Sequence, residues 1–168
     1  LSAPTLLYDG SILAKPGGNA GQGSGNGGSL TVATPQIGAN PGTLTVQQSA
    51  AAPPDGLAPT DVLPAALAGD IIFQADLLGG SGITSLTLSS GLIAGDTPNT
   101  ASYAPGTIAF NGNVTLGGLN PAAGGLQSLI LDASTVQLLA GVSSDVTLAA
   151  NYVALRGSKG TAVPTAGD

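Results

Sequence analysis

The chain lacks cysteine, methionine, tryptophan and histidine, and its nine acidic residues are all aspartates because glutamate is absent as well. Without cysteine there is no disulfide, no thiolate nucleophile and no Cys-ligated metal, which fits export through an oxidising compartment. Aromatic residues make up only 3% of the chain, so large rings cannot anchor a core. Glu, Lys and Arg, which favour helix surfaces, are nearly missing. The protein is therefore predicted to be almost entirely β.

Charge is also scarce. Charged residues are 7% of the chain, the net charge is −6, and the only cations are Lys15, Arg156 and Lys159. Three scattered cations give no footprint for phosphates, so nucleic acid and anionic membrane surfaces are poor partners. No apolar run is long enough to span a bilayer, and Leu1-Ser2-Ala3-Pro4 lacks a charged signal-peptide start. With no initiator Met, we expect a mature product or an excerpt of a longer chain.

The chain is rich in aliphatic residues. Hydrophobic residues are 42% of it, supplied by Leu, Val, Ile and Ala beside 27 Gly and 12 Pro. A chain this rich in aliphatic residues should fold, and its length predicts one domain over residues 1–168. Two stretches are predicted as loops: the Gly-rich residues 16–28 and the Ala- and Pro-rich residues 49–68, in which Pro64–Ala68 could form one helical turn.

Short runs that alternate apolar, polar and apolar residues recur along the chain, and such alternation predicts strands with one buried face. The runs come in pairs whose first apolar residues are six or seven positions apart. These pairs are Leu6/Ile12, Leu30/Ile37, Ile71/Leu77, Leu86/Ile93, Ile108/Val114, Leu129/Val136 and Val146/Val153. Successive pairs begin about twenty residues apart, as in a solenoid that buries its apolar stripe only against the coils above and below.

These patterns predict a parallel β-helix of seven coils, about twenty residues each, with aliphatic ladders inside. The central Thr residues of the runs should point outward; they are Thr31, Thr45, Thr87, Thr115 and Thr147. The alternative is a β-sandwich, but its hairpins need tight two-residue turns, for which Gly79-Gly80 is the nearest signal.

Three segments carry a resemblance to a known family: APTLLYDGSILAKPGG, FQADLLGGSGITSLTLSSG, and the run from FNGNVTLGGLN through LQSLILDASTVQLLAG to VTLAANYVALRG. They resemble the filamentous-haemagglutinin-type exoproteins of two-partner secretion systems, in particular their carboxy-terminal region, and the similarity covers most of the chain. The resemblance implies a right-handed β-helix, export through an outer-membrane barrel transporter, and a role as an adhesin shaft or as the stalk of a contact-dependent toxin. It assigns no residue-level site.

A catalytic role is the alternative to a structural one. Glycoside hydrolysis needs two carboxylates within about 5 to 10 Å. Asp70 and Asp76 are six positions apart and Asp132 and Asp145 thirteen apart, and neither spacing predicts that the two carboxylates lie on one face. Without histidine, a lyase would also lack a general base. We expect no enzyme and no catalytic, metal or cofactor-binding residues.

Other motifs have simpler interpretations. Asp9, Asp55 and Asp96 adjoin Gly or Thr, where a short acceptor caps turn backbone rather than binding calcium. The dinucleotide-like glycines of residues 23–28 precede a strand, Leu30-Thr31-Val32, instead of a helix. The Thr array could suggest ice binding, although Thr also suits any exposed strand. Asn113-Val114-Thr115 matches a glycosylation acceptor, but Val114 is assigned to the core.

The sequence therefore predicts a structural or adhesive shaft segment of a large secreted bacterial surface protein. Expected partners are the outer-membrane two-partner secretion transporter, a host or neighbouring-cell surface with its glycans, and further coils of the same chain or copies of it packed end to end. A carbohydrate-binding or carbohydrate-active β-helix is the alternative function.

Overall fold

The computed structural model describes residues 6, 8, 10–15, 27–34, 43–49, 61–62, 71–90, 106–119, 125–141 and 144–157. These parts of the chain form strands and one short 3-10 helix. The strands are β1 Gly28–Thr34, β2 Thr43–Gln47, β3 Ile71–Gln74, β4 Ile83–Ser90, β5 Thr107–Asn111, β6 Val114–Gly117, β7 Leu126–Asp132, β8 Thr135–Leu138 and β9 Val146–Arg156; the helix is η1, Ala75–Leu78. The prediction of an all-β protein is confirmed for the described residues.

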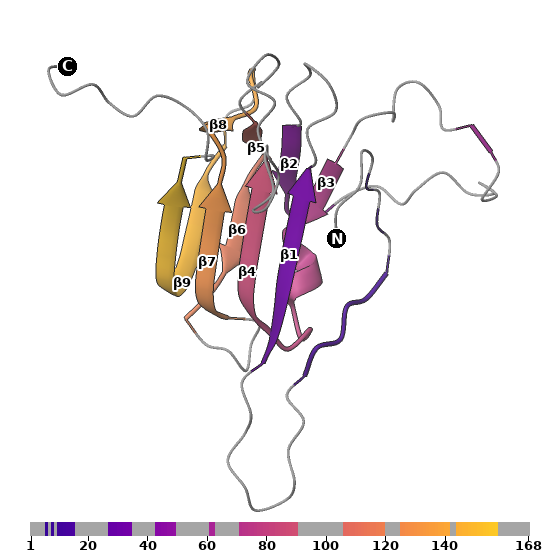
Figure 1. Cartoon of the computed structure of the whole chain (residues 1–168), viewed down its shortest axis with the longest axis vertical. Coiled ribbons are helices and arrows are strands. Elements are labelled where there is room, and N and C mark those ends of the chain that lie inside the picture. The colour runs from indigo at the N-terminus through magenta and orange to yellow at the C-terminus, as the bar shows by residue number, and fades with distance from the viewer. Residues whose placement is uncertain are drawn as a thin grey trace, which may run out of the picture.

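The strands form two sheets. The first, sheet A, has the order β1-β4-β7-β9-β6, and the second, sheet B, has the order β3-β2-β5-β8. Figure 1 shows β1, β4, β7 and β9 side by side with their arrows in one direction, and sheet B behind them. Every pairing between the described strands is parallel. The antiparallel β-sandwich considered from the sequence is therefore excluded for these residues.

Sheet A curls because its strand β9 belongs to two ladders. The first four residues of β9, from Val146, pair with β6, and the later residues, from Ala150, pair with β7. We call the pairing of β6 with β9 the third ladder. The helix η1 also contacts β6. The strand thus turns a corner without a loop, and sheet A becomes a curled half-barrel that closes round one side of the core.

One strand departs from chain order. β3 follows β2 in the sequence, yet it pairs with the edge of β2 that lies away from β5. Leu6, from the start of the chain, forms an isolated parallel bridge with Ile71 of β3. β3 and β5 therefore lie on opposite edges of β2.

The core consists of aliphatic ladders between the sheets. Like residues stack in register, for example Leu86 on Leu129 and Leu44 on Ile108. All four side chains are 0 or 1% exposed. The alternate residues point outward, and the five central Thr residues are all exposed or half-buried, as predicted. Alternation thus identified the inward positions correctly.

The predicted repeat of about twenty residues is wrong. Stacked residues are 24 positions apart for Leu129 and Val153, 32 for Asn113 and Asp145, and 64 for Gln47 and Asn111. The reason is that successive apolar runs alternate between ladders instead of filling one.

The runs that were expected to begin consecutive coils illustrate this. Leu86 belongs to sheet A, Ile108 to sheet B, and Leu129 returns to sheet A. On sheet A the described strands make four levels, β1, β4, β7 and β9, where seven coils were predicted.

The paired runs have mixed outcomes. Ile108 and Val114 lie in the consecutive strands β5 and β6, joined by a corner at Gly112, as predicted. Val146 and Val153 lie on one strand, on either side of its change of ladder. Leu77 was expected in a strand but belongs to η1.

Several expectations fall outside the described residues. Ile37, Ile93 and the helical turn at Pro64–Ala68 are among them, as are most of the two predicted loops. At the boundary of the first loop, Gly28 already begins β1. The dinucleotide-like glycines are thus followed by a strand, as expected.

Candidate functional site

One surface of defined geometry is the outward face of sheet A. Its side chains form columns across the four strands β1, β4, β7 and β9. One column contains Ser29, Ser85, Ser128 and Tyr152; the next contains Thr31, Thr87, Ile130 and Ala154; the third contains Ala33, which is buried, with Ser89, Asp132 and Arg156. The face changes from small hydroxyls on β1 and β4 to an aromatic and charged margin on β9.

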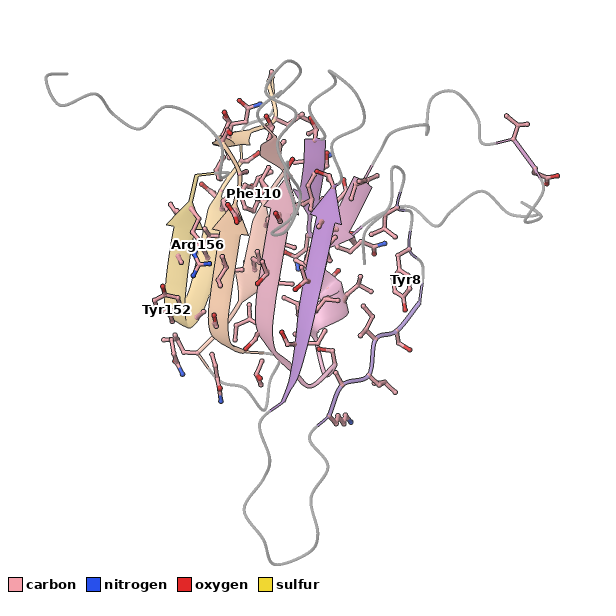
Figure 2. All side chains as sticks on the ribbon, viewed as in Figure 1. Tyr8, Phe110, Tyr152 and Arg156 are labelled. Carbon is pink, nitrogen blue, oxygen red and sulfur yellow. The ribbon has the colours of Figure 1, made fainter. Side chains whose placement is uncertain are left out.

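That margin, which we call the β9 patch, consists of Ser128, Asp132, Tyr152, Ala154 and Arg156. Tyr152 is 55% exposed, and Figure 2 shows it and Arg156 along the outer edge of β9. Ser128 is the register neighbour of Tyr152, and Asp132 that of Arg156. The neighbouring strands themselves lie about 4.7 to 4.9 Å apart. Ala154 lies between the two large side chains on the same face of β9.

Asp132 carries an unmet acceptor. Its Oδ1 atom is shielded from solvent and accepts no hydrogen bond. A buried acceptor without a donor costs roughly 1 to 3 kcal/mol. Because this atom is shielded from solvent, a bound molecule could reach only the other carboxylate oxygen, while the guanidinium of Arg156 offers donors at the neighbouring position. The β9 patch therefore combines an exposed ring, hydroxyl and carboxylate acceptors, and a cation.

Sheet B carries a second polar feature, an amide ladder. Gln74, Gln47 and Asn111 end the adjacent strands β3, β2 and β5 in register. Asn111 Nδ2 donates to Gln47 Oε1 at 3.1 Å, and Gln74 Nε2 donates to the Tyr8 carbonyl at 2.6 Å. The amide ladder thus lies at the carboxyl ends of these strands, and Gln74 connects it to Tyr8 near the start of the chain.

Gln48, one residue beyond the amide ladder, joins three elements. Its Nε2 donates to Asp76 Oδ1 at 2.5 Å, and its Oε1 accepts from the Thr115 backbone N–H at 2.8 Å. Its carbonyl accepts from the Asp76 backbone N–H at 3.0 Å. Gln48 thus links β2 to η1 and β6, which makes it a structural residue rather than part of a site.

Sequence reasoning missed both the β9 patch and the amide ladder. The ladder had a signal, since three runs of the form apolar, any residue, apolar end in an amide: Leu44 to Gln47, Ile71 to Gln74 and Ile108 to Asn111. A further ladder, Thr43 with Thr107 and Thr135, begins the strands β2, β5 and β8. The patch had no such signal because it depends on the register between β7 and β9.

Of the two carboxylate pairs considered for catalysis, only Asp132 and Asp145 lie within the described residues. Asp132 ends β7 beside Arg156, the last residue of β9, whereas Asp145 precedes the first residue of β9. The two carboxylates thus lie at opposite ends of an 11-residue strand. Asp70 lies outside the described residues, as do Asp9, Asp55 and Asp96, so their roles stay predictions.

The other motifs take structural places. The five Thr residues divide among three ladders, with Thr31 beside Thr87 and Thr115 beside Thr147, and so form no single array. Val114 is 2% exposed, as its assignment to the core requires. Asn113 Oδ1 accepts from the Asp145 backbone N–H at 2.9 Å.

Within the described residues no three potential metal-ligating side chains come together. The same residues include no helix with the length and apolar character needed to cross a membrane. No family model matches the chain, and neither the curated proteins nor the solved structures include a significant match.

Proposed function

We propose that this chain is a segment of a right-handed parallel β-helix that serves as a structural or adhesive shaft of a large secreted bacterial surface protein. The order of the ladders is the observation that carries the proposal. From β4 the chain visits sheet A, sheet B and the third ladder as β4, β5 and β6, and repeats the order as β7, β8 and the first half of β9. The second half of β9 then returns to sheet A.

A shaft role is supported by what covers these ladders. The outward columns of sheet A carry mainly hydroxyls and small side chains, with charge confined to Asp132 and Arg156. Such a surface stays soluble along its length and can contact sugars or other uncharged polar surfaces. Asp132 and Asp145 lie at opposite ends of β9, and the absence of this convergence favours a structural role over carbohydrate cleavage.

Location and attachment test this proposal. Antibody fragments raised against the 168-residue chain should label intact, unpermeabilised cells of the organism that encodes it. The same fragments should reduce attachment of these cells to host or neighbouring cells, while fragments against an unrelated surface protein should not. Labelling that requires permeabilised cells would contradict a surface location, and undiminished attachment would contradict adhesion.

The β9 patch supports carbohydrate binding as a second candidate. An exposed tyrosine beside hydroxyl, carboxylate and guanidinium groups suits a sugar ring, which stacks on the aromatic face and exchanges hydrogen bonds at its rim. The purified chain would be applied to a glycan array. Tyr152→Ala should abolish the signal and Tyr152→Phe should keep most of it. Equal signals from Tyr152→Ala and the unchanged chain would exclude the patch.

A further inference from the structure

The aliphatic ladders end abruptly on the last strands. In sheet A, Val153 and Leu155 of β9 stack on Leu129 and Leu131. Leu129 and Leu131 are both 0% exposed, whereas Val153 and Leu155 are 41% and 67% exposed. The inward positions of the last strand are therefore partly exposed, and no described strand pairs with β9 beyond them.

Sheet B ends in the same way. Val136 and Leu138 of β8 stack on Ile108 and Phe110. The two β5 residues are 0 and 2% exposed, and the two β8 residues are 39% and 47% exposed. Both β8 and the second half of β9 also have one edge that pairs with no described strand. We call Val136, Leu138, Val153 and Leu155 with these two edges the end face.

The opposite end of the ladders is covered. There Leu6, Ile12 and Ala14 pack against the core. Ile72 donates its backbone N–H to the Leu6 carbonyl at 3.2 Å, and the Ala14 N–H donates to the Ser81 carbonyl at 2.6 Å. Figure 2 shows this first segment, with Tyr8, along the flank of the sheets beyond β1. The chain thus caps one end of its core and exposes the other.

An open edge with an apolar rung needs an occupant with extended backbone and aliphatic side chains. Residues 158–168 are a poor source, because Val163 is the only Val, Leu or Ile among them. The capped end of another copy is less suitable, since Leu6 already bonds to β3 and Ala14 to the start of β1. The end face of a second copy supplies both requirements, and a two-fold axis makes one surface sufficient for both partners.

We propose that two copies of this chain associate tail to tail through their end faces, with β9 pairing antiparallel to β9 of the second copy. A two-fold axis at Val153 sets Val153 against its counterpart and Leu155 against Asn151. It places Arg156, the only charged residue of β8 and β9, opposite Ala150 and away from the second Arg156. The arrangement extends both ladders by one rung and requires no like charges to meet. It does not depend on the adhesive role.

The oligomeric state of the full 168-residue chain tests the proposal. Sedimentation velocity and light scattering over a wide range of concentrations should show a monomer–dimer equilibrium. Leu155→Lys should weaken the dimer at least about tenfold, because each copy would bury an unpaired charge. The matched control is Ser29→Lys, at an exposed outward position of β1, which should dimerise like the unchanged chain. Unaltered circular dichroism in both variants shows that the fold is kept.

The absence of cysteine permits a second test. Val153→Cys gives a single thiol at the proposed axis, where antiparallel neighbours have Cα atoms about 4.5 to 5.5 Å apart, within disulfide range. With oxidised glutathione as the oxidant, two such thiols should form an intermolecular disulfide, and Ser29→Cys should not. A chain that stays monomeric overturns the proposal. So do equal dimerisation of Leu155→Lys, equal cross-linking of the two cysteine variants, and a series of larger oligomers, which would indicate head-to-tail contacts.

Discussion

Leu129 and Val153 occupy the same register position on the neighbouring strands β7 and β9, yet Leu129 is fully buried whereas 41% of Val153 is exposed. The difference comes from their neighbours. Leu129 has Leu86 on one side and Val153 on the other, while Val153 has a partner on one side only. Burial in this fold is therefore set by the number of stacked levels around a position as well as by the side chain.

This relationship predicts unequal costs for the same kind of truncation. Leu129→Ala should lower the free energy of unfolding by about 2 to 5 kcal/mol, because it leaves a cavity between two levels. Val153→Ala should cost less than about 1 kcal/mol in the dilute monomer, since solvent fills the space. Urea denaturation at low protein concentration measures both. Equal costs would show that β9 is covered in solution.

The alternation along β9 gives a prediction about charge. Val146 is half-buried and stacks on Val114, whereas its neighbour Thr147 is exposed and lies beside Thr115. Val146→Asp should cost about 2 kcal/mol or more, because a carboxylate would point into the aliphatic ladder. Thr147→Asp should change the stability by about 0.5 kcal/mol or less. Thermal melts would compare them, and matching melting temperatures would mean that the inward and outward assignment of β9 is wrong.

Gln48 predicts the cost of losing a link between elements. Gln48→Ala removes the hydrogen bonds to Asp76 Oδ1 and from the Thr115 N–H. Loss of these partners should lower the stability by about 1 to 3 kcal/mol. Gln127→Ala, at an exposed position of β7, is the control and should be nearly neutral. Chemical denaturation of both variants decides whether the Gln48 side chain holds η1 and β6 to β2.

Gln48→Glu adds a pH dependence. The introduced carboxylate would face Asp76 Oδ1, and like charge at this distance raises the pKa of the introduced group in the folded state. A raised folded pKa means that stability is lost as the pH rises through that pKa and is regained below it. The deficit of Gln48→Glu relative to the unchanged chain should therefore shrink on acidification. A deficit that is constant between neutral and acidic pH would contradict the contact.

Alanine substitutions at two glycines distinguish the cost of backbone strain from the cost of a steric collision. Gly112 and Gly117 both have positive φ, at 75° and 84°. A Cβ on Gly112 meets nothing within 4 Å, while one on Gly117 would collide with the Ala149 carbonyl oxygen and approach Leu126 Cδ1 at 2.9 Å. Gly112→Ala should cost about 1 to 2 kcal/mol from conformation alone. Gly117→Ala should cost clearly more, and equal losses in urea titrations would show that β6 and β9 separate easily.

The sequence predicted the strands and their inward residues well, because alternation is a local property. Leu86, Ile108 and Leu129 are buried as expected, and the predicted corner between Ile108 and Val114 lies at Gly112. Parallel pairing was also predicted correctly. The alternation and the corner depend on residues close together in the sequence, whereas parallel pairing was inferred from the recurrence of the runs along the chain.

The register between paired strands could not be predicted from the sequence. Its stacked partners are separated by up to 64 positions, with segments of unequal length between them. No spacing rule indicated that β3 would pair on the far edge of β2, or that β9 would serve two ladders. The exposure of Val136 and Val153, both predicted as core, depends on how many levels follow them. The β9 patch depends on the same long-range register.

The place of β3 at the far edge of β2 has a consequence for the order of folding. Leu6 finds its partner only when Ile71 arrives, and Ala14 needs Ser81. A chain that emerges amino terminus first therefore cannot add finished layers one after another. Leu6 and Ala14 can form these bonds only after residues 71–81 have been made. The layer at the capped end of the core is therefore completed after strands that come later in the sequence have formed.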